Sequence, residues 1–350
     1  MLSDKSILNL VIASYLEEEH VDRIRSVSKR LNVLYEPELL PTPRYAADHI
    51  GNPFTRTPDQ ENRWQKLLQR ADILFDFDRT HLEDLPELAP HVLWIQATSA
   101  GIGQLVKRWQ YHIRLPHTVI TTATGIHAQP LTEFCVMAMT LFSRGFFTMA
   151  HGQKRKHWQR FAGTDLVERT LLIIGAGAIG SEVARCAKTL GMYVIGVKRR
   201  ISGIDPSALN MDRLYAPNEL HSALRSADYL VLCAPHTDKT DAMLGAEEFS
   251  LMPRGAIFIN IGRGALVDEP DLIEALRSGQ LGGACLDVFA NEPLPENSPL
   301  WEMPNVLISP HSASTSDREN RRLTDLFCDN LNRFLSNKPM KNVFDVDNFY

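Results

Sequence analysis

The sequence lacks the long apolar run that a membrane-spanning helix requires. Its most apolar longer segment, residues 134–150, is interrupted by Ser143, Arg144 and Gly145, so it falls short of the roughly 18 to 20 apolar residues that cross a bilayer. The sequence also lacks an excess of basic charge, since 37 Lys and Arg stand against 42 Asp and Glu. We therefore expect neither a membrane nor a nucleic acid as a partner.

Cysteine is scarce, and its spacing is not that of a metal site or a disulfide framework. No C-x-x-C occurs, and the five cysteines are far apart, each in an apolar stretch: Cys135, Cys186, Cys233, Cys285 and Cys328. Such thiols are typical of buried, reduced side chains, which predicts a cytoplasmic protein without a metal centre. Internal repeats and low-complexity segments are also absent, and 350 residues are enough for two domains.

Short apolar runs alternate with longer amphipathic stretches, which is the pattern of βαβ units in a parallel sheet. In the first part of the chain, strands are expected at residues 7–14, 33–35, 73–77, 92–97 and 119–122. A second series begins near residue 168, with strands expected at residues 170–174, 193–197, 229–233, 256–261, 283–287 and 306–309. The sequence thus predicts an α/β protein with two doubly wound domains.

A glycine-rich turn follows the strand expected at residues 170–174. It reads Gly175-Ala176-Gly177-Ala178-Ile179-Gly180 and opens a helix. In this context Gly175 allows the tight turn, Gly177 lets the backbone approach a pyrophosphate, and Gly180 lets helix and strand pack closely. Ala178 and Ile179 begin the helix, whose N–H groups favour phosphate. The pattern predicts a dinucleotide site; the alternative is a glycine-rich turn without a ligand.

The next strand ends in three basic residues, Lys198, Arg199 and Arg200. NAD-binding proteins of this kind carry an acidic residue about 20 residues past the glycines, where it binds the ribose hydroxyls. Three cations attract a 2′-phosphate instead and can donate hydrogen bonds to its oxygens. We therefore predict NADP(H) in preference to NAD(H). The alternative is a solvated charge run in a loop.

One Arg, one Glu and one His follow three later strands. Arg263 follows the strand expected at residues 256–261, Glu292 follows the next strand, and His311 follows the last. The carboxyl ends of parallel strands face the ligand crevice of such sheets. An anion binder, a carboxylate and an imidazole at that edge form a plausible hydride-transfer site, although each could instead be structural.

At these residues the sequence resembles the D-isomer-specific 2-hydroxyacid dehydrogenase family. Its members carry an Arg in an N-x-x-R-G stretch, a Glu in D-V-F-x-x-E-P and a His in P-H-x-A. Arg263, Glu292 and His311 match these motifs, with spacings of 29 and 19 residues. Within the family the sequence looks most like the NADPH-dependent glyoxylate/hydroxypyruvate reductases, which reduce 2-keto acids.

The resemblance implies roles for these side chains. Arg263 would hold the carboxylate and the 2-keto oxygen of the substrate. His311 would act as general acid on the developing alkoxide, and Glu292 would fix its tautomer. The family also implies further cofactor contacts at Ala234, Pro235, Thr240, Ile261, Gly262 and Asp287, besides Arg263 and His311. It implies substrate contacts at Ala100, Gly101 and Ile102; the commoner family pattern has Asp or Asn at the position of Gly103.

The resemblance also implies an architecture. Residues 1–123 and 317–350 would form a discontinuous, flavodoxin-like substrate domain, and residues 124–316 a Rossmann NAD(P)-binding domain, with a cleft between them. Family members are usually homodimers through the cofactor domain.

The main functional expectation is therefore an oxidoreductase that reduces a small 2-keto acid to the D-2-hydroxy acid with NADPH. Two alternatives remain open. The first is an NAD-linked enzyme that oxidises D-2-hydroxy acids. The second is a nucleotide-sensing scaffold, like the corepressors that share this fold, which would bind peptides and prefer NAD(H). The basic residues Lys198, Arg199 and Arg200 favour the reductase.

Overall fold

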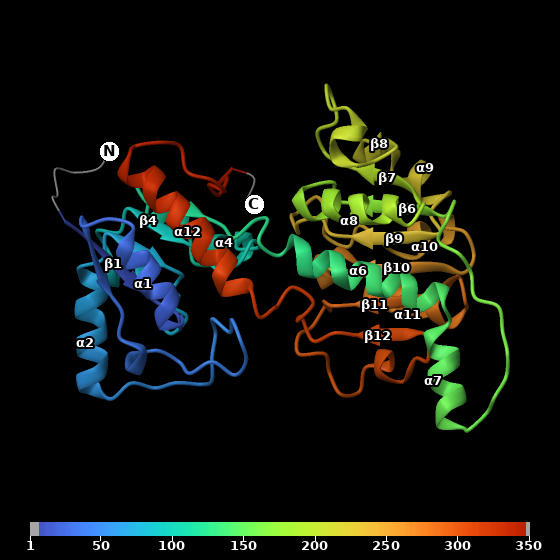
Figure 1. Cartoon of the computed structure of the whole chain (residues 1–350), viewed down its shortest axis with the longest axis horizontal. Coiled ribbons are helices and arrows are strands. Elements are labelled where there is room, and N and C mark those ends of the chain that lie inside the picture. Colours follow the sequence, from blue (N-terminus) through green and yellow to red (C-terminus); the bar gives the residue numbers. More distant parts are fainter. Residues whose placement is uncertain (1–6, 348–350) are drawn as a thin grey trace. The chain divides into compact units, whose positions relative to one another are not determined.

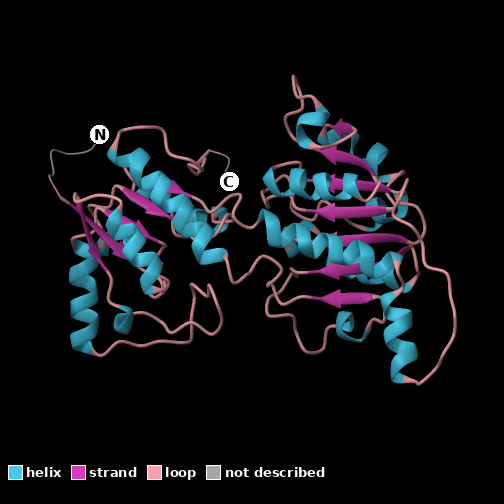
Figure 2. Cartoon of the chain, viewed as in Figure 1, coloured by secondary structure: helices cyan, strands magenta, loops and turns pink. Residues whose placement is uncertain are grey.

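The computed structural model describes residues 7–347, and the chain divides into two compact units (Figures 1 and 2). Unit 1 comprises Met1–Ile126 and Thr315–Tyr350, and unit 2 comprises His127–Ser314. Each unit is a parallel sheet with helices packed on its faces (Figure 2). The predicted fold class, two parallel α/β domains, is confirmed.

The sheet of unit 1 has the strand order β2-β1-β3-β4-β5, with all pairs parallel. This is the flavodoxin-like order. The strands are β1 (Leu8–Ile12), β2 (Leu31–Leu34), β3 (Ile73–Phe75), β4 (Trp94–Gln96) and β5 (Val119–Thr121). The helices are α1 (Glu18–Ser26), α2 (Pro58–Gln69), α3 (Leu85–Leu88), α4 (Gly103–Arg108), α5 (Tyr111–Arg114) and α12 (Glu319–Leu335).

Helix α12 completes unit 1 although it comes from the end of the chain. Its side chains Leu323, Phe327 and Leu331 are fully buried. The ring of Phe327 lies 5.0 Å from that of Trp94, on β4, and α12 packs beside α1 (Figure 1). Apolar residues spaced four apart face one side of a helix, so burial of this stripe holds the C-terminal helix on the sheet.

The sheet of unit 2 has the strand order β12-β11-β10-β9-β6-β7-β8, again all parallel. The strands are β6 (Thr170–Ile174), β7 (Tyr193–Val197), β8 (Arg213–Tyr215), β9 (Tyr229–Leu232), β10 (Ala256–Asn260), β11 (Leu281–Leu286) and β12 (Val306–Ile308). The helices are α6 (Ala128–Ser143), α7 (Phe146–Lys154), α8 (Ala178–Thr189), α9 (Leu220–Leu224), α10 (Ala246–Leu251) and α11 (Glu269–Arg277). The strand order reverses between β6 and β9, which is where ligands bind in such sheets.

Several strand bounds in both units differ from the sequence expectation, and one strand was not expected at all. Strand β8 was not predicted, because it is three residues long at the sheet edge and begins with the exposed Arg213. Strand β2 begins at Leu31, earlier than the expected 33–35. The apolar segment 134–150 forms parts of two helices, because Gly145 between them adopts a left-handed conformation with φ 67°.

A buried polar network fixes the loop after β3 in unit 1. The carboxylate of Asp78 accepts hydrogen bonds from Trp64 Nε1 (2.7 Å), Thr80 Oγ1 (2.6 Å) and His81 Nδ1 (2.8 Å). On the other side of its ring, His81 Nε2 lies 3.1 Å from Glu61 Oε1. The hydrogen bond to Asp78, which outweighs burial, raises the pKa of His81 above its ordinary value. Burial by itself raises the pKa of Asp78, but the three hydrogen bonds outweigh it and hold that pKa below its ordinary value.

We expect His81→Gln to lower the free energy of unfolding by about 1.5–3 kcal/mol at pH 5.5, as for other hydrogen bonds to charged groups. A raised folded-state pKa means that this stabilisation is complete below about pH 6.5, the unfolded value, and is lost as pH rises through the folded-state pKa. The midpoint of thermal unfolding, measured across this range, should therefore differ most from wild type at low pH. His91→Gln, at an exposed histidine of the same unit, is the control; an equal effect of the two variants at all pH values would contradict the prediction.

Candidate functional site

The glycine-rich turn lies at the carboxyl end of β6 and opens α8. Gly175 has φ 109°, and a Cβ there would lie 2.7 Å from the backbone of Cys233 and Ala234. A Cβ on Gly180 would lie 2.5 Å from the Gly175 carbonyl oxygen. At Gly177, by contrast, a Cβ would meet no atom within 4 Å, so protein packing does not require glycine at this position. Gly177 lies at the N-terminus of a helix, and packing within the protein does not explain why it is glycine. Close approach of a pyrophosphate to the backbone would explain it.

The three basic residues follow β7 at the same edge of the sheet. Lys198 is half-buried, and its Nζ donates a hydrogen bond to the carbonyl oxygen of Ala176 at 2.9 Å. This bond ties the end of β7 to the glycine-rich turn. Arg199 and Arg200 are exposed. The turn and its positive charges therefore lie together, which suits a dinucleotide that carries an additional phosphate.

Residues 234–240, after β9, form a turn that is stabilised by hydrogen bonds within the turn. Thr240 Oγ1 donates to the carbonyl oxygen of Pro235 at 2.9 Å and accepts from the N–H of Thr237 at 2.8 Å. Ala234 is buried beside the glycine-rich turn. The hydroxyl of Thr240 thus shapes the turn, and any contact of this segment with a ligand depends on that shape.

Arg263 follows β10 in a turn that a buried amide fixes. The side chain of Asn260 accepts a hydrogen bond from the N–H of Gly262 at 3.0 Å and donates one to the carbonyl oxygen of Arg263 at 3.2 Å. Ile261 is buried, and the guanidinium of Arg263 donates through Nη1 to the Gly262 carbonyl at 2.7 Å. Sequence reasoning missed the role of Asn260; the signal was a polar residue at the end of an otherwise apolar strand.

Gly264 brings the Arg263 turn against the segment that carries Glu292. A Cβ at position 264 would lie 1.9 Å from the carbonyl carbon of Phe289, a distance at which the two segments would have to separate. Glycine at this position therefore fixes how closely the turn after β10 packs on the segment after β11.

Glu292 and His311 contact each other directly. Glu292 Oε2 lies 2.7 Å from His311 Nδ1, and Glu292 Oε1 accepts a hydrogen bond from the N–H of Phe289 at 3.0 Å. An ionised carboxylate only accepts hydrogen bonds, so the Nδ1 atom carries a proton and the Nε2 atom is the one available to a substrate. His311 itself has φ 53°, and its N–H donates to the backbone carbonyl of Asp287 at 3.0 Å.

Electrostatics link these groups to the guanidinium. Burial by itself raises the pKa of Glu292, but hydrogen bonds from His311 and Phe289, with the charge of Arg263, outweigh it and lower the pKa below its ordinary value. The carboxylate is therefore ionised at neutral pH, and it loses its charge only as pH falls through the lowered pKa. Burial lowers the pKa of Arg263, opposed by Glu292 and Asp287; an arginine nonetheless keeps its charge.

The loop with the predicted substrate contacts belongs to unit 1. Residues 99–103 follow β4 at the carboxyl edge of that sheet. The side chain of Ile102 is buried in the core of unit 1, so only its backbone is available to a ligand. Ala100 is partly exposed and Gly101 is exposed, which leaves the backbone there accessible. Gly103 is the first residue of α4.

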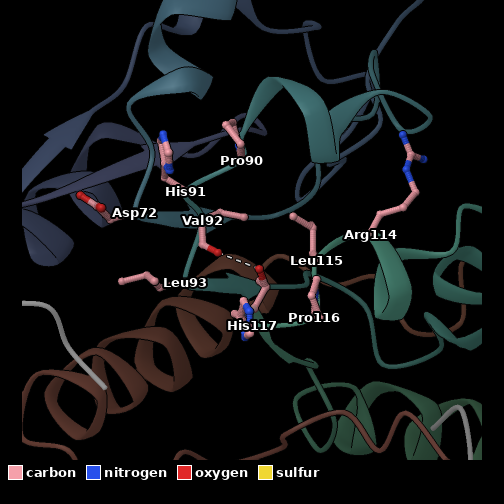
Figure 3. A pocket seen from close by; sticks show the side chains of 10 residues that line it. Asp72, Pro90, His91, Val92, Leu93, Arg114, Leu115, Pro116 and His117 are labelled. Carbon is pink, nitrogen blue, oxygen red and sulfur yellow. Dashed lines mark hydrogen bonds between the residues drawn. The ribbon is translucent and has the colours of Figure 1, made fainter.

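A pocket in unit 1 lies at the opposite, amino-terminal edge of its sheet, where Asp72, Leu93 and Thr118 precede β3, β4 and β5. Figure 3 shows that its polar side chains do not converge. Arg114 points away from the others and pairs with Glu87. Among residues 7–347 no cluster of His, Cys, Asp or Glu has the arrangement of a metal site. Over the same residues, no helix combines the length and apolarity that crossing a membrane demands.

Comparisons with known proteins show which family the chain is similar to. The sequence model of the D-isomer specific 2-hydroxyacid dehydrogenase NAD binding domain matches residues 136–313. A glyoxylate reductase of Aeropyrum pernix is 33% identical over 285 residues, which cover 79% of this chain and 83% of that protein.

Two solved structures are similar along almost the whole chain. One is a D-isomer specific 2-hydroxyacid dehydrogenase family protein of Aeromonas salmonicida, 29% identical, with a TM-score of 0.79 over 98% of this chain and 100% of that one. The other is an NADPH-dependent glyoxylate/hydroxypyruvate reductase of Sinorhizobium meliloti in complex with NADP and sulfate. It is 25% identical, with a TM-score of 0.77 over 98% and 100% of the two chains.

Proposed function

We propose a reaction for this chain, which belongs to the D-isomer specific 2-hydroxyacid dehydrogenase family and is an NAD(P)-dependent oxidoreductase. It reduces a small 2-keto acid, of the glyoxylate or hydroxypyruvate type, to the D-2-hydroxy acid with NADPH. The observation that carries the proposal is the contact of 2.7 Å between His311 and Glu292, together with the electrostatic interaction of Glu292 with Arg263. Unit 2 would hold the cofactor, and the loop at residues 99–103 of unit 1 would contribute to substrate binding.

The residues perform distinct steps in this proposal. Arg263 binds the substrate carboxylate and the 2-keto oxygen through paired N–H donors, which orients the carbonyl carbon. When bound, the reduced nicotinamide supplies the hydride. The imidazolium of His311 donates its Nε2 proton to the oxygen that gains negative charge, and Glu292 keeps the ring oriented through Nδ1. In the reverse direction His311 accepts the proton.

The proposal is tested by NADPH oxidation with a panel of 2-keto acids: glyoxylate, hydroxypyruvate and branched and aromatic 2-keto acids. We expect turnover with at least one small member, and a D-configured product from every acid whose reduction creates a stereocentre; glyoxylate gives an achiral product. A protein that binds NADPH and peptides, yet turns over no 2-keto acid, would instead support the scaffold function. Higher kcat/KM for oxidation of D-2-hydroxy acids with NAD than for any reduction with NADPH would support the NAD-linked alternative.

We expect Lys198→Asp to lower the ratio of kcat/KM with NADPH to that with NADH by about 10- to 100-fold. The new carboxylate would repel a 2′-phosphate and could accept hydrogen bonds from ribose hydroxyls. The expected change corresponds to about 1.4–2.7 kcal/mol. Steady-state kinetics with both cofactors measure the ratio.

Two controls separate charge from loop geometry, because Lys198 also holds the Ala176 carbonyl. Lys198→Met removes that bond without adding a negative charge, and it should lower the ratio less than the Asp variant. Arg225→Asp reverses an exposed charge that precedes β9, at the opposite edge of the sheet, and should leave the ratio unchanged. A ratio that stays at the wild-type value in Lys198→Asp would remove the basic cluster as the phosphate site.

Two further parts of the proposal concern the assembly and the location. We propose a homodimer through unit 2, since several large apolar side chains are exposed on residues 137–167: Met137, Phe146, Met149, Trp158, Phe161 and Val167. Trp158 is 95% exposed, and aromatic residues are enriched in the cores of protein–protein interfaces. Light scattering of the purified chain gives the mass that tests this. The five free cysteines support a cytoplasmic location.

A further inference from the structure

We propose that Asp287 and Ser309 are positioning residues for His311, and that together they form a clamp on the turn at residues 309–313. The clamp holds this turn in the conformation that presents the His311 ring to Glu292. The inference rests on the proposed function, in which His311 is the proton donor. It assigns a role to Ser309 that neither the motifs nor the resemblance gives.

The clamp is built on one carboxylate oxygen. Asp287 follows β11 and is only 2% exposed. Its Oδ1 atom accepts three hydrogen bonds, from Ser309 Oγ at 2.6 Å, from the N–H of Ser312 at 2.8 Å and from the N–H of Ala313 at 2.9 Å. The backbone carbonyl of Asp287 accepts the N–H of His311 at 3.0 Å. One residue therefore takes four hydrogen bonds from the five-residue turn.

The conformation of His311 explains why the turn needs such a clamp. Its φ of 53° lies in the left-handed region, which side chains with a Cβ rarely adopt because of the clash with the following carbonyl. Such a conformation persists only where the surroundings fix it. Asp287 binds the Ser309 hydroxyl before the strained residue, the N–H of His311 itself, and the N–H groups of Ser312 and Ala313 after it, so Asp287 is the residue that fixes the turn.

The ring and the backbone of His311 are held by separate anchors. Glu292 binds the ring at Nδ1 and is itself held by the N–H of Phe289. Asp287 binds the turn. Both acidic residues lie in the segment that follows β11, so the ring is oriented relative to a single piece of chain. Loosening the clamp changes neither the imidazole nor Glu292, but it lets the ring turn away from its productive orientation. The rate of proton transfer therefore falls more than the affinity for the substrate does.

Ser309 is the part of the clamp that can be removed without touching the backbone or a charge. We expect Ser309→Ala to lower kcat about tenfold, the loss that corresponds to one hydrogen bond to a charged group. The KM for the 2-keto acid and the Kd for NADPH should change less than about twofold, since Arg263, the glycine-rich turn and the Asp287 side chain, with its bonds to Ser312 and Ala313, are all retained. Ser309→Thr keeps the hydroxyl and should restore kcat to within about twofold of wild type.

Ser250→Ala is the matched control. It removes a hydroxyl from the exposed side of α10 in the same unit, where Ser250 Oγ donates to the Glu247 carbonyl at 2.7 Å. We expect wild-type kinetics from it. The clamp is disproved if Ser309→Ala keeps the kcat of Ser250→Ala, or if Ser309→Thr is as slow as Ser309→Ala. Should the Ala variant fail to fold, Ser309→Cys replaces it, because a thiol of similar size is only a weak donor.

A second readout separates failure of the clamp from failure of the proposed function. Nitrogen-correlated NMR spectra of the His311 ring need no turnover. We expect one sharp set of ring signals in wild type and in Ser250→Ala, and shifted or broadened signals in Ser309→Ala. If wild type reduces no 2-keto acid, the proposed function is wrong and these spectra alone decide the clamp. If wild type is active and the spectrum of Ser309→Ala is unchanged, the clamp is wrong and the function stands.

Discussion

His311→Gln is expected to lower kcat for every 2-keto acid that the wild type reduces by about 10²- to 10⁴-fold, the usual contribution of a positioned general acid. Glutamine can still donate a hydrogen bond to Glu292 but has no titratable proton to give to the alkoxide. The affinity for NADPH should change little, because the glycine-rich turn, Lys198 and every other expected cofactor contact except His311 are unchanged. Steady-state NADPH oxidation gives kcat, and fluorescence titration gives the cofactor affinity.

The chain offers a close control for this variant. His221, on α9, also contacts a glutamate, with Nε2 at 2.9 Å from Glu248 Oε1, and it lies in the same unit. His221→Gln removes a comparable surface pair and should leave kcat unchanged. If His311→Gln keeps more than about one-tenth of the wild-type kcat, which is far above what loss of a general acid allows, another group must donate the proton.

The sequence alone was sufficient to predict the fold class and the family, and both predictions are confirmed. The reason is physical: strands of a buried parallel sheet are nearly continuous apolar runs, as in residues 171–174 and 256–259, and each is followed by a turn residue or a polar group. Short edge strands such as β8 carry no such signal, since an edge strand can be exposed on one side and needs few apolar residues.

The roles of the site residues are a different matter. Motif spacing placed Arg263, Glu292 and His311 at three strand ends, and the structure brings the latter two into contact. Spacing does not specify hydrogen-bond partners, however. A lone Asn or Ser at a strand end has many possible partners, so the sequence did not predict that Asn260 and Ser309 fix the turns beside Arg263 and His311. The catalytic and cofactor roles themselves stay predictions until the variants are measured.

Lys198 illustrates the same limit for charge. The sequence predicted that three cations attract a 2′-phosphate, but it did not predict that the first of them, Lys198, donates a hydrogen bond to the Ala176 carbonyl. An ammonium group has three donors, so this bond does not remove Lys198 from phosphate binding. It adds a structural role, which is why charge removal and charge reversal at this position are expected to differ.

Arg263→Ala is expected to lower kcat/KM for the 2-keto acid by about 10²- to 10⁴-fold. The proposed site uses two hydrogen bonds from the guanidinium to an anionic substrate, each worth about 1.5–3 kcal/mol, and 1.36 kcal/mol corresponds to a factor of ten. Arg263→Lys keeps the charge but not the paired donors, so it should recover only part of this loss. Added guanidinium should restore more activity to the Ala variant than added ammonium.

Arg254 provides the control, because it precedes the same strand that Arg263 follows. It donates through Nη2 to the Ser278 carbonyl at 2.7 Å, at the amino end of β10. If Arg263 contributes to kcat/KM by binding the anionic substrate at the carboxyl edge of the sheet, Arg254→Ala should keep the wild-type kcat/KM even if it lowers the melting temperature. Equal losses in the two variants would mean that Arg263 acts through folding of the strand. If Arg263→Ala keeps the wild-type kcat/KM, another residue must bind the substrate carboxylate. That residue would then also set the orientation that proton transfer from His311 requires.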